Sequence, residues 1–356
     1  MNITPLARLY RGRCTSAQRA GVCRASSSWF AAAWALTGAL VLGAALGLAP
    51  APASAQSLVW PKAQPIKLVA VFPPGGSVDQ VARILQPALQ SLLQQTVVVD
   101  NRGGASGSIG TGQVAKAEPD GYTFAVVFDT HAVNPALLPS LPFDTRRDLA
   151  PVIMIGTSAM VLAAHVDSPY KTFGDAVSAA RTRNGVPYGT IGNGSLGHLA
   201  VSLLARAHNL GFQHVPYRGG GPLMNDAVAG HVPVSIGSVF LLKPHIDSGK
   251  LRPLAVTTNR RVAALANVPT VSESGFAGFD APAWWAVVAP ARTPPDVLRQ
   301  MNEALNAALR QPDVAARLAG QGIEVRGGSA DAARSFIEGQ IDTWAKVVRE
   351  NDIKAD

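Results

Sequence analysis

The chain has 356 residues, which is enough for two compact domains, and its composition is that of an ordinary globular protein. Its formal net charge is +8, but residues 1–55 contain five arginines and no acidic residue. The rest of the chain carries 26 basic and 23 acidic residues. This near balance does not support a nucleic-acid partner, which would need a clustered basic surface.

The N-terminal region has the pattern of a secretory signal peptide. A basic segment is followed by the uncharged run "WFAAAWALTGALVLGAALGLAP" (29–50) and by "APASA", which ends at Ala55. These features predict cleavage after a signal peptide at 1–55 and location in the periplasm. An uncleaved membrane anchor is the alternative, because residues 29–49 are long enough to span a bilayer. Cys14 and Cys23 would leave with the signal, so the mature chain would have no disulfide and no thiol chemistry.

The first part of the mature chain alternates between strands and helices. The run "IKLVAVF" (66–72) has the length and apolar character of a strand buried on both faces. Ser77 and Gln80 have capping-box spacing, and apolar residues then recur along one helical face. Further strands are predicted at 96–100 and 122–128, with a helix at 108–117 between them. This alternation predicts an α/β fold with a parallel or mixed sheet.

The alternation resumes after 151–156, so the chain contains two α/β blocks. Strands are predicted at 160–165, 186–190 and within 275–290, and 232–236 and 253–257 are apolar segments. Helices are predicted at 172–183, before Asn209, before Ala229, from the "TPPD" at 293–296, and at 329–350. Thr293 is the expected N-cap of the fourth of these helices, with Pro294 at its first position. The C-terminal helices could belong to either block.

Three Gly-rich turns, at 73–77, 101–110 and 191–199, each lead into a helix. The first turn lacks the G-K-[ST] of a P-loop and does not fit the G-x-G-x-x-G dinucleotide fingerprint, which disfavours a nucleotide. Free N–H groups and the helix dipole at such a turn suit a carboxylate as well as a phosphate. A tight turn that needs glycine for its backbone angles is the structural alternative.

Enzymatic motifs are weak, and we expect no catalysis. The segment "NGSLG" (193–197) nearly matches the nucleophile elbow, but Asn193 stands at its first position. Ser195 and His198 are three residues apart at a helix start, which does not give the geometry of a catalytic triad. The histidines show no metal-binding spacing, so neither a metal nor a cofactor is expected.

The order and spacing of many short motifs resemble those of the Bug family, the periplasmic solute receptors of tripartite tricarboxylate transporter systems. The resemblance covers nearly the whole mature chain. It is carried by "PIKLVAVFPPGGSVDQVAR" (65–83), "VVVDNRGGASGSIGTGQVAKAEPDGYTF" (97–124), "NPALLPSLPFDTRRDLAPV" (134–152), "GNGSLGHLA" (192–200), "VPYRGGGPLMNDAVAGHV" (215–232), "SGKLRPLAVTTNRR" (248–261), "VPTVSESGFAGFDAPAWW" (268–285) and "APARTPPDVLRQMNEAL" (289–305).

The resemblance implies a two-lobed, type II Venus-flytrap fold with a ligand cleft between the lobes. Lobe one would comprise 56–156 and 278–356, and lobe two would comprise 157–277. A small organic carboxylate would be bound in the cleft and passed by a monomeric receptor to membrane permease subunits. The turns at 73–77 and 103–108 would face the turn at 192–198.

The motif match also assigns candidate ligand-binding residues. They are Gly75, Gly76, Ser77, Asp79, Gly104, Ala105, Ser106, Ser195, His198 and Tyr217. Each side chain has a structural alternative: Asp79 and Ser195 could cap helices, and Tyr217 could pack in the core.

One segment departs from the family pattern. Where the family usually has an apolar stretch ending in an acid or amide, this chain reads "VPVSIGSVF" (232–240), with Ser238 near its end. A serine cannot carry charge, so the departure bears on the ligand's identity. A second reading of the same fold remains open, in which the closed receptor signals to a membrane sensor instead of feeding a transporter.

Overall fold

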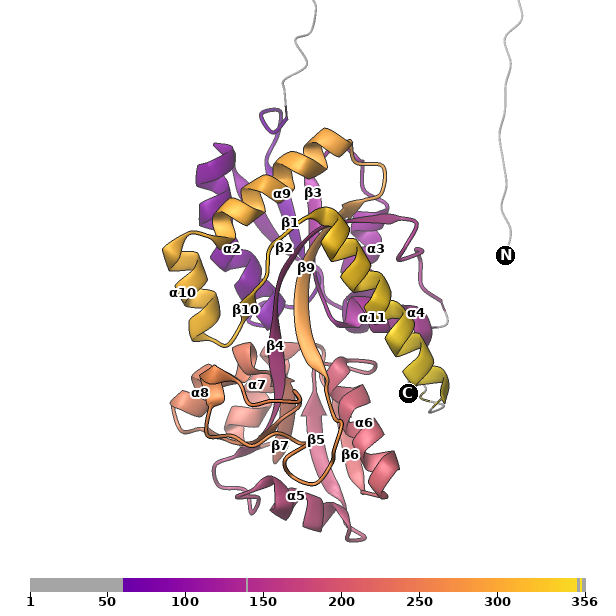
Figure 1. The fold of residues 1–356 in the computed structure, drawn as a ribbon, viewed down its shortest axis with the longest axis vertical. Coiled ribbons are helices and arrows are strands. Elements are labelled where there is room, and N and C mark those ends of the chain that lie inside the picture. Colours follow the sequence, from indigo (N-terminus) through magenta and orange to yellow (C-terminus); the bar gives the residue numbers. More distant parts are fainter. Residues whose placement is uncertain (1–59, 139, 351–352, 354–356) are drawn as a thin grey trace, which may run out of the picture. The chain divides into compact units, whose positions relative to one another are not determined.

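The computed structural model describes residues 60–138, 140–350 and 353 (Figure 1). The predicted signal peptide and its two cysteines lie outside these residues. Within them, no helix combines the length and apolar character needed to cross a membrane. The described chain forms mixed β-sheets covered by helices, and the strands follow the order β2-β1-β3-β9-β4-β7-β5-β6.

The first half of this strand order forms lobe one. Its strands are β1 (Ile66–Ala70), β2 (Val97–Asn101), β3 (Thr123–Phe128), the first part of β4 (Leu149–His165), β9 (Pro282–Pro290) and β10 (Glu324–Val325). β1 pairs in parallel with β2 and β3, whereas β9 runs antiparallel to β3 and β4. The C-terminal part of the chain therefore returns to the lobe built by its beginning.

Seven helical segments accompany these strands. They are α2 (Ser77–Leu93), η1 (Ala105–Gly107), α3 (Ser108–Ala115), α4 (Thr130–Leu137), α9 (Pro295–Leu309), α10 (Pro312–Gly320) and α11 (Ala330–Glu350). In Figure 1, α2, α9 and α10 lie on one side of the strands, and α4 and α11 lie on the other. In α11, Ile337, Ile341, Trp344 and Val348 recur every three or four residues in the sequence and are buried. Helical periodicity thus identified the packed face correctly.

Lobe two contains the end of β4 together with the strands and helices between residues 173 and 265. The strands are β5 (Val186–Thr190), β6 (Phe212–Pro216), β7 (Val234–Ser238) and β8 (Leu251–Val256). The helices are α5 (Phe173–Ala180), α6 (Leu196–His208), α7 (Gly220–Ala229), α8 (Val239–Asp247) and η2 (Ala263–Leu265). β5 is parallel to β6 and β7, which is the doubly covered arrangement expected of an α/β lobe.

β4 belongs to both lobes. Its residues Leu149–Ala159 pair with β9, and Met160–His165 pair with β7 and β8. The sequence predicted separate segments at 151–156 and 160–165, but the structure has one continuous strand of 17 residues. Gly156 and Thr157 do not interrupt it because both pair across to β9 or β10. The predicted lobe boundary at 156–157 falls inside this strand, and the exact lobe limits stay a prediction.

Two tryptophans of β9 fill the core where the lobes meet. Trp284 and Trp285 are both fully buried. Trp285 packs against Phe128 of β3 at a ring-centroid distance of 5.0 Å and against Phe240 of α8 at 5.7 Å. Because Phe128 and Phe240 belong to different lobes, this aromatic group is continuous across the connection between them.

Two helix-start predictions are wrong by one residue. Gly76, rather than Ser77, is the N-cap of α2, and Gln80 Nε2 donates to the carbonyl oxygen of Gly75 instead of completing a capping box. Pro294, rather than Thr293, precedes α9, with Pro295 at its first helical position. In both cases a fixed backbone geometry next to the helix, a Gly-rich turn or a proline pair, sets the first residue.

Candidate ligand-binding cleft

The first Gly-rich turn is held by Asp79. The backbone N–H of Gly75, which has a φ of +79°, donates to Asp79 Oδ2 at 2.9 Å. The other carboxylate oxygen accepts from Arg83 Nε at 2.8 Å and from Asn101 Nδ2 at 2.9 Å. Asp79 is 4% exposed, so its carboxylate is committed to protein groups. In this structure its role is to shape the turn and to leave the N–H groups at the start of α2 free of a helical partner.

The second turn runs through four consecutive residues with positive φ, Gly104, Ala105, Ser106 and Gly107. Two of them carry a Cβ, which makes the left-handed region unfavourable by roughly 1–2 kcal/mol each. The turn is held by Asn134 of α4, whose Nδ2 donates to the Ser106 carbonyl at 3.0 Å. Ser106 Oγ in turn donates to the carbonyl oxygen of Asn193 in lobe two. Residues 104–107 therefore contact the third Gly-rich turn, as the family resemblance implied.

The third turn enters α6 through Ser195. Ser195 is completely buried and acts as the N-cap, its hydroxyl oxygen accepting from the N–H of His198 at 3.3 Å. His198 Nδ1 accepts from the N–H of Gly194 at 3.2 Å. The His198 ring stacks on His214 of β6, with centroids 3.9 Å apart. His214 is a partly buried strand residue hydrogen-bonded to Thr190 Oγ1.

Tyr217 lies after β6 and is fixed by α7. Its hydroxyl donates to Asp226 Oδ2 at 2.9 Å. Desolvation, followed by the hydrogen bond to the Asp226 carboxylate and its charge, raises the pKa of Tyr217 to about 12. The phenol is therefore neutral at any physiological pH. Asp79, Ser195, His198 and Tyr217 thus all have partners within the protein, and direct contact of these side chains with a ligand stays a prediction.

A fourth turn, missed in the sequence, meets the first turn across the cleft. A Cβ built on Gly221 would lie 2.5 Å from the carbonyl oxygen of Pro74, and one on Gly76 would lie 3.5 Å from the Gly220 nitrogen. The two backbones can approach this closely only because glycine has no side chain. The run "RGGGP" (218–222) was the available signal, three glycines at the start of a helix.

A narrow cavity lies between these turns, with room for about one water molecule. It is lined by Phe72, Gly76, Ser77, Val78, Phe128, Met160, Ile191, Gly220, Gly237, Ser238 and Leu241. Two of the predicted site residues, Gly76 and Ser77, lie on its wall, as does Ser238, where the family pattern departs. The other eight predicted residues do not line it. Among the described residues that line the cavity, none carries a charge.

Three helices begin at this cavity. Gly76, Ser77 and Val78 are the N-cap and first residues of α2, Gly220 is the first residue of α7, and Ser238 is the N-cap of α8. Each helix start carries partial positive charge and N–H groups without a helical partner. The cleft is thus electropositive through its backbone rather than through arginine or lysine, and this arrangement suits a small anion.

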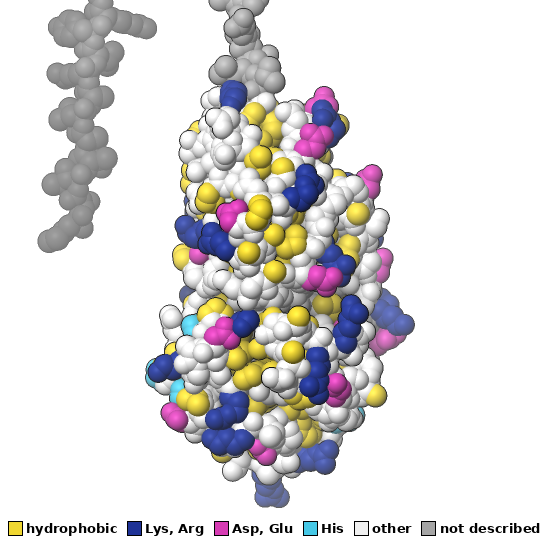
Figure 2. All heavy atoms as spheres, turned by 60° about the vertical axis from the view of Figure 1, so that its left-hand side comes forward, with side chains coloured by type: hydrophobic (Ala, Val, Ile, Leu, Met, Phe, Trp, Pro, Cys, Tyr) yellow, Lys and Arg dark blue, Asp and Glu magenta, His cyan; other side chains and the backbone are white. Residues whose placement is uncertain are grey.

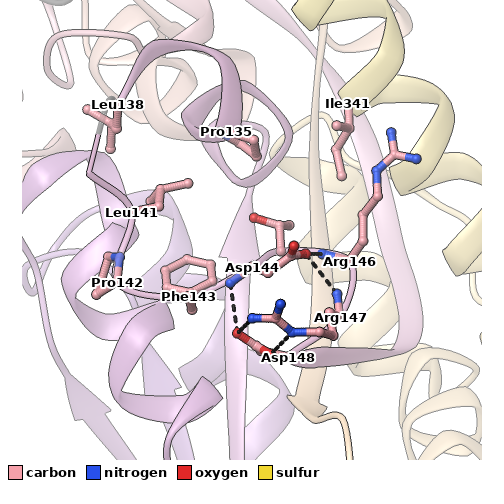
Figure 3. A pocket seen from close by; sticks show the side chains of 11 residues that line it. Pro135, Leu138, Leu141, Pro142, Phe143, Asp144, Arg146, Arg147, Asp148 and Ile341 are labelled. Carbon is pink, nitrogen blue, oxygen red and sulfur yellow. Dashed lines mark hydrogen bonds and ion pairs between the residues drawn. The ribbon is translucent and has the colours of Figure 1, made fainter.

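A larger hollow of about 1100 Å³ lies elsewhere, beside α4 and α11 (Figure 3). Its charged groups are already paired: Arg147 Nε with Asp148 at 2.9 Å and Arg146 Nη2 with Asp342 at 2.6 Å. The Asp144 carboxylate accepts from the N–H groups of Arg146 and Arg147. These bonds fix the 144–148 loop, so we assign this hollow to loop structure rather than to a ligand.

The fold and the cleft define a two-lobed solute-binding protein. Residues 81–353 match the family described as the tripartite tricarboxylate transporter family receptor, and the chain belongs to this family. No group of three or more potential metal-ligating side chains is found among the residues that the structure describes.

Individual relatives agree with this assignment. Protein BugT of Bordetella pertussis (strain Tohama I) is 37% identical over 307 residues, covering 85% of this chain and 93% of BugT. The structure of R. palustris Rpa4515 with adipate has a TM-score of 0.79 and 33% identity, covering 83% of this chain and 99% of that one. MatC (Rpa3494) from Rhodopseudomonas palustris with bound malate has a TM-score of 0.77 and 28% identity, with coverages of 81% and 99%.

Proposed function

We propose that this protein is a periplasmic receptor that binds a small organic carboxylate between its lobes without transforming it. The observation that carries the proposal is the convergence of the starts of α2, α7 and α8 on a cavity whose described lining has no charged side chain. Backbone N–H groups at helix starts suit a carboxylate. Two related structures, described above with adipate and with bound malate, support the same ligand class.

The receptor would act as a monomer and deliver its ligand to the membrane permease subunits of a tripartite transporter. Family membership supports this role. Acidic and basic side chains are interspersed on the face of the molecule in Figure 2, rather than gathered by sign. That pattern fits a receptor that meets its partner through a specific docking surface rather than through a broad charged patch.

A ligand screen tests the binding proposal directly. The mature chain, beginning near Gln56, is screened by thermal shift against carboxylic acids of increasing chain length. A ligand at about 100 times its Kd should add about 2.7 kcal/mol to the free energy of unfolding. Each acid that binds is then compared with its amide and its methyl ester. We expect the neutral derivatives to bind far more weakly, because the N–H donors lose a charged acceptor; equal binding of acid and amide would contradict a carboxylate site.

Uptake measurements test the delivery step. Cells that lack this gene, but keep the permease subunits, should fail to accumulate the radiolabelled acid found in the screen, and a plasmid copy should restore uptake. Normal uptake in the deletion strain would contradict delivery. A lost transcriptional response to the acid in that strain would instead indicate signalling to a membrane sensor.

A further inference from the structure

Asp129 is a buried carboxyl group at the contact between the lobes. It follows the last residue of β3 and has no exposed surface. Phe128, the residue before it, lines the cavity of the cleft. Neither carboxylate oxygen makes a well-formed hydrogen bond. The nearest groups that favour its charged form are the N–H groups of Thr130 and of Leu196, the first residue of α6 in lobe two.

Within the part of the chain that the structure describes, no cationic side chain lowers the pKa of this carboxyl. Burial raises the pKa of Asp129 well above its ordinary value, and among the described residues only the N–H groups of Thr130 and Leu196 lower it. His131, two residues away on α4, is itself buried, and desolvation lowers its pKa to about 4. His131 is therefore neutral at pH 7.

Two further polar atoms close to Asp129 in the sequence also lack partners. Besides the two Asp129 oxygens, Thr130 Oγ1 and Asn134 Oδ1 are buried without a hydrogen bond. Both residues lie on α4, and Asn134 uses its amide nitrogen for the Ser106 carbonyl. Buried polar groups in native proteins are generally satisfied by protein, water or ligand. The two Asp129 oxygens therefore call for a partner that donates hydrogen bonds and carries positive charge.

An alkylammonium group has these properties, with three N–H donors and one positive charge. If the ligand also carries a carboxylate, each of its two charges would lie next to a group of opposite charge in the closed cleft. The carboxylate would lie at the starts of α2, α7 and α8, and the ammonium would lie at the end of β3. A second carboxylate at that end would instead meet Asp129 as a like charge.

We propose that Asp129 determines the specificity of the cleft by binding the ammonium group of an amine-bearing carboxylic acid. This assignment rests on the proposed function and names the ligand class of the same site. Because Leu196 and Asp129 belong to different lobes, closure around such a ligand would bury the ion pair that the ligand completes. Ligand and closure would thus favour each other.

Matched acid pairs test the assignment. Titration calorimetry of the mature protein uses butanoate with 4-aminobutanoate, succinate with L-aspartate, and glutarate with L-glutamate; the members of each pair differ by one amine. We expect the wild type to prefer the amine-bearing member of at least one pair by more than tenfold. Asp129→Asn should reduce that preference at least tenfold, mainly by weakening binding of the amine-bearing acid.

Two further variants keep the outcome interpretable. Asp167→Asn removes the same charge from a side chain that is 87% exposed, and it should keep the wild-type preference. Asp129→Ser tests the same loss with a smaller side chain, and circular dichroism verifies that each variant is folded. Wild-type protein that binds the amine-free member as well or better in every pair would overturn the role of Asp129 while leaving a carboxylate receptor, as would a preference unchanged in both Asp129 variants. Binding of no acid at all would overturn the proposed function as well.

Discussion

Ser106 and Asn193 join the two lobes: the hydroxyl of Ser106 in the second Gly-rich turn donates to the carbonyl of Asn193, 87 residues further along the chain. The acceptor is a backbone atom, so the bond does not depend on the side chain at position 193. Opening of the cleft must break it, and closure re-forms it. Ser106 therefore stabilises the closed state without lining the cavity.

Replacing Ser106 with Ala should weaken ligand binding several-fold. One neutral hydrogen bond contributes about 0.5–1.5 kcal/mol, and the bond exists only when the lobes are together. Calorimetry gives the affinity, and small-angle scattering at a fixed ligand concentration should show less compaction. Ser248→Ala, which removes an exposed hydroxyl bonded to the His245 carbonyl, serves as the control. Unchanged affinity of the Ser106 variant would mean that the bond does not report on closure.

Replacing Gly221 with Ala should hinder closure of the cleft without lowering the stability of the protein. The added Cβ would lie 2.5 Å from the Pro74 carbonyl oxygen across the cleft, so the lobes could not close fully. Within α7, alanine is more favourable than glycine by up to about 1 kcal/mol. We expect an affinity at least tenfold lower with an unchanged or higher melting temperature.

Gly339→Ala is the matched control for this variant. Gly339 lies within α11, and an added Cβ there meets no atom within 4 Å. This variant should melt at a higher temperature than wild type and bind normally. If Gly221→Ala also binds normally, the approach of the two turns is not part of the ligand-bound state.

The stability of the ligand-free protein should depend on pH through Asp129. Its pKa in the folded state is raised above the unfolded value of 3.8. Its contribution is therefore fully present below about pH 4 and is lost as the pH rises through the raised pKa. Asp129→Asn should consequently stabilise the empty protein more at pH 7.5 than at pH 4. Melting curves of both proteins at the two pH values check this, and a pH-independent difference would show that the carboxyl is solvated in the empty form.

The contribution of His131 to the stability of the protein should change with pH in the opposite direction. Burial lowers its pKa from 6.5 to about 4, so its contribution is present above pH 6.5 and is lost as the pH falls to about 4. The loss corresponds to about 3 kcal/mol. Arg146, Arg334 and Glu338 line the same small hollow as His131.

The test for His131 is how steeply the free energy of unfolding falls as the pH is lowered. Denaturant unfolding at pH 7, 5.5 and 4 should show a shallower decline for His131→Gln than for wild type. Parallel curves for the two proteins would assign the acid sensitivity to other groups.

Export should remove the N-terminal segment. Mass spectrometry of protein recovered from the periplasm should give a mature N-terminus near Gln56 and a chain without cysteine. Detection of Cys14 or Cys23 in the soluble periplasmic form would contradict the signal-peptide prediction.

Local patterns in the sequence were sufficient for most elements of the fold. β5 begins and ends at the predicted residues, and the buried face of α11 matches the periodic apolar positions. These features depend on neighbouring residues and on a single buried face. The continuity of β4 could not be predicted in this way, because it depends on pairing with β9, more than 100 residues away.

The candidate site was less predictable for the same reason. Gly76 and Ser77 were identified because their turn has a local signature, and both line the cavity. Gly220, Gly221 and Asp129 were missed because their surroundings come from the opposite lobe. A buried aspartate cannot be told from an exposed one in a single sequence; only the contact with α6 reveals it.

The strand shared by both lobes has a consequence for how the protein unfolds. β4 cannot lose its order at one end without removing a pairing partner from β9 in one lobe or from β7 and β8 in the other. Trp285 forms a second connection between the lobes, since its indole packs against Phe128 of lobe one and Phe240 of lobe two. The lobes can therefore move relative to each other about this connection, yet they should melt together in one cooperative calorimetric transition. A mutation that unfolds lobe two would then also destabilise the C-terminal helices of lobe one.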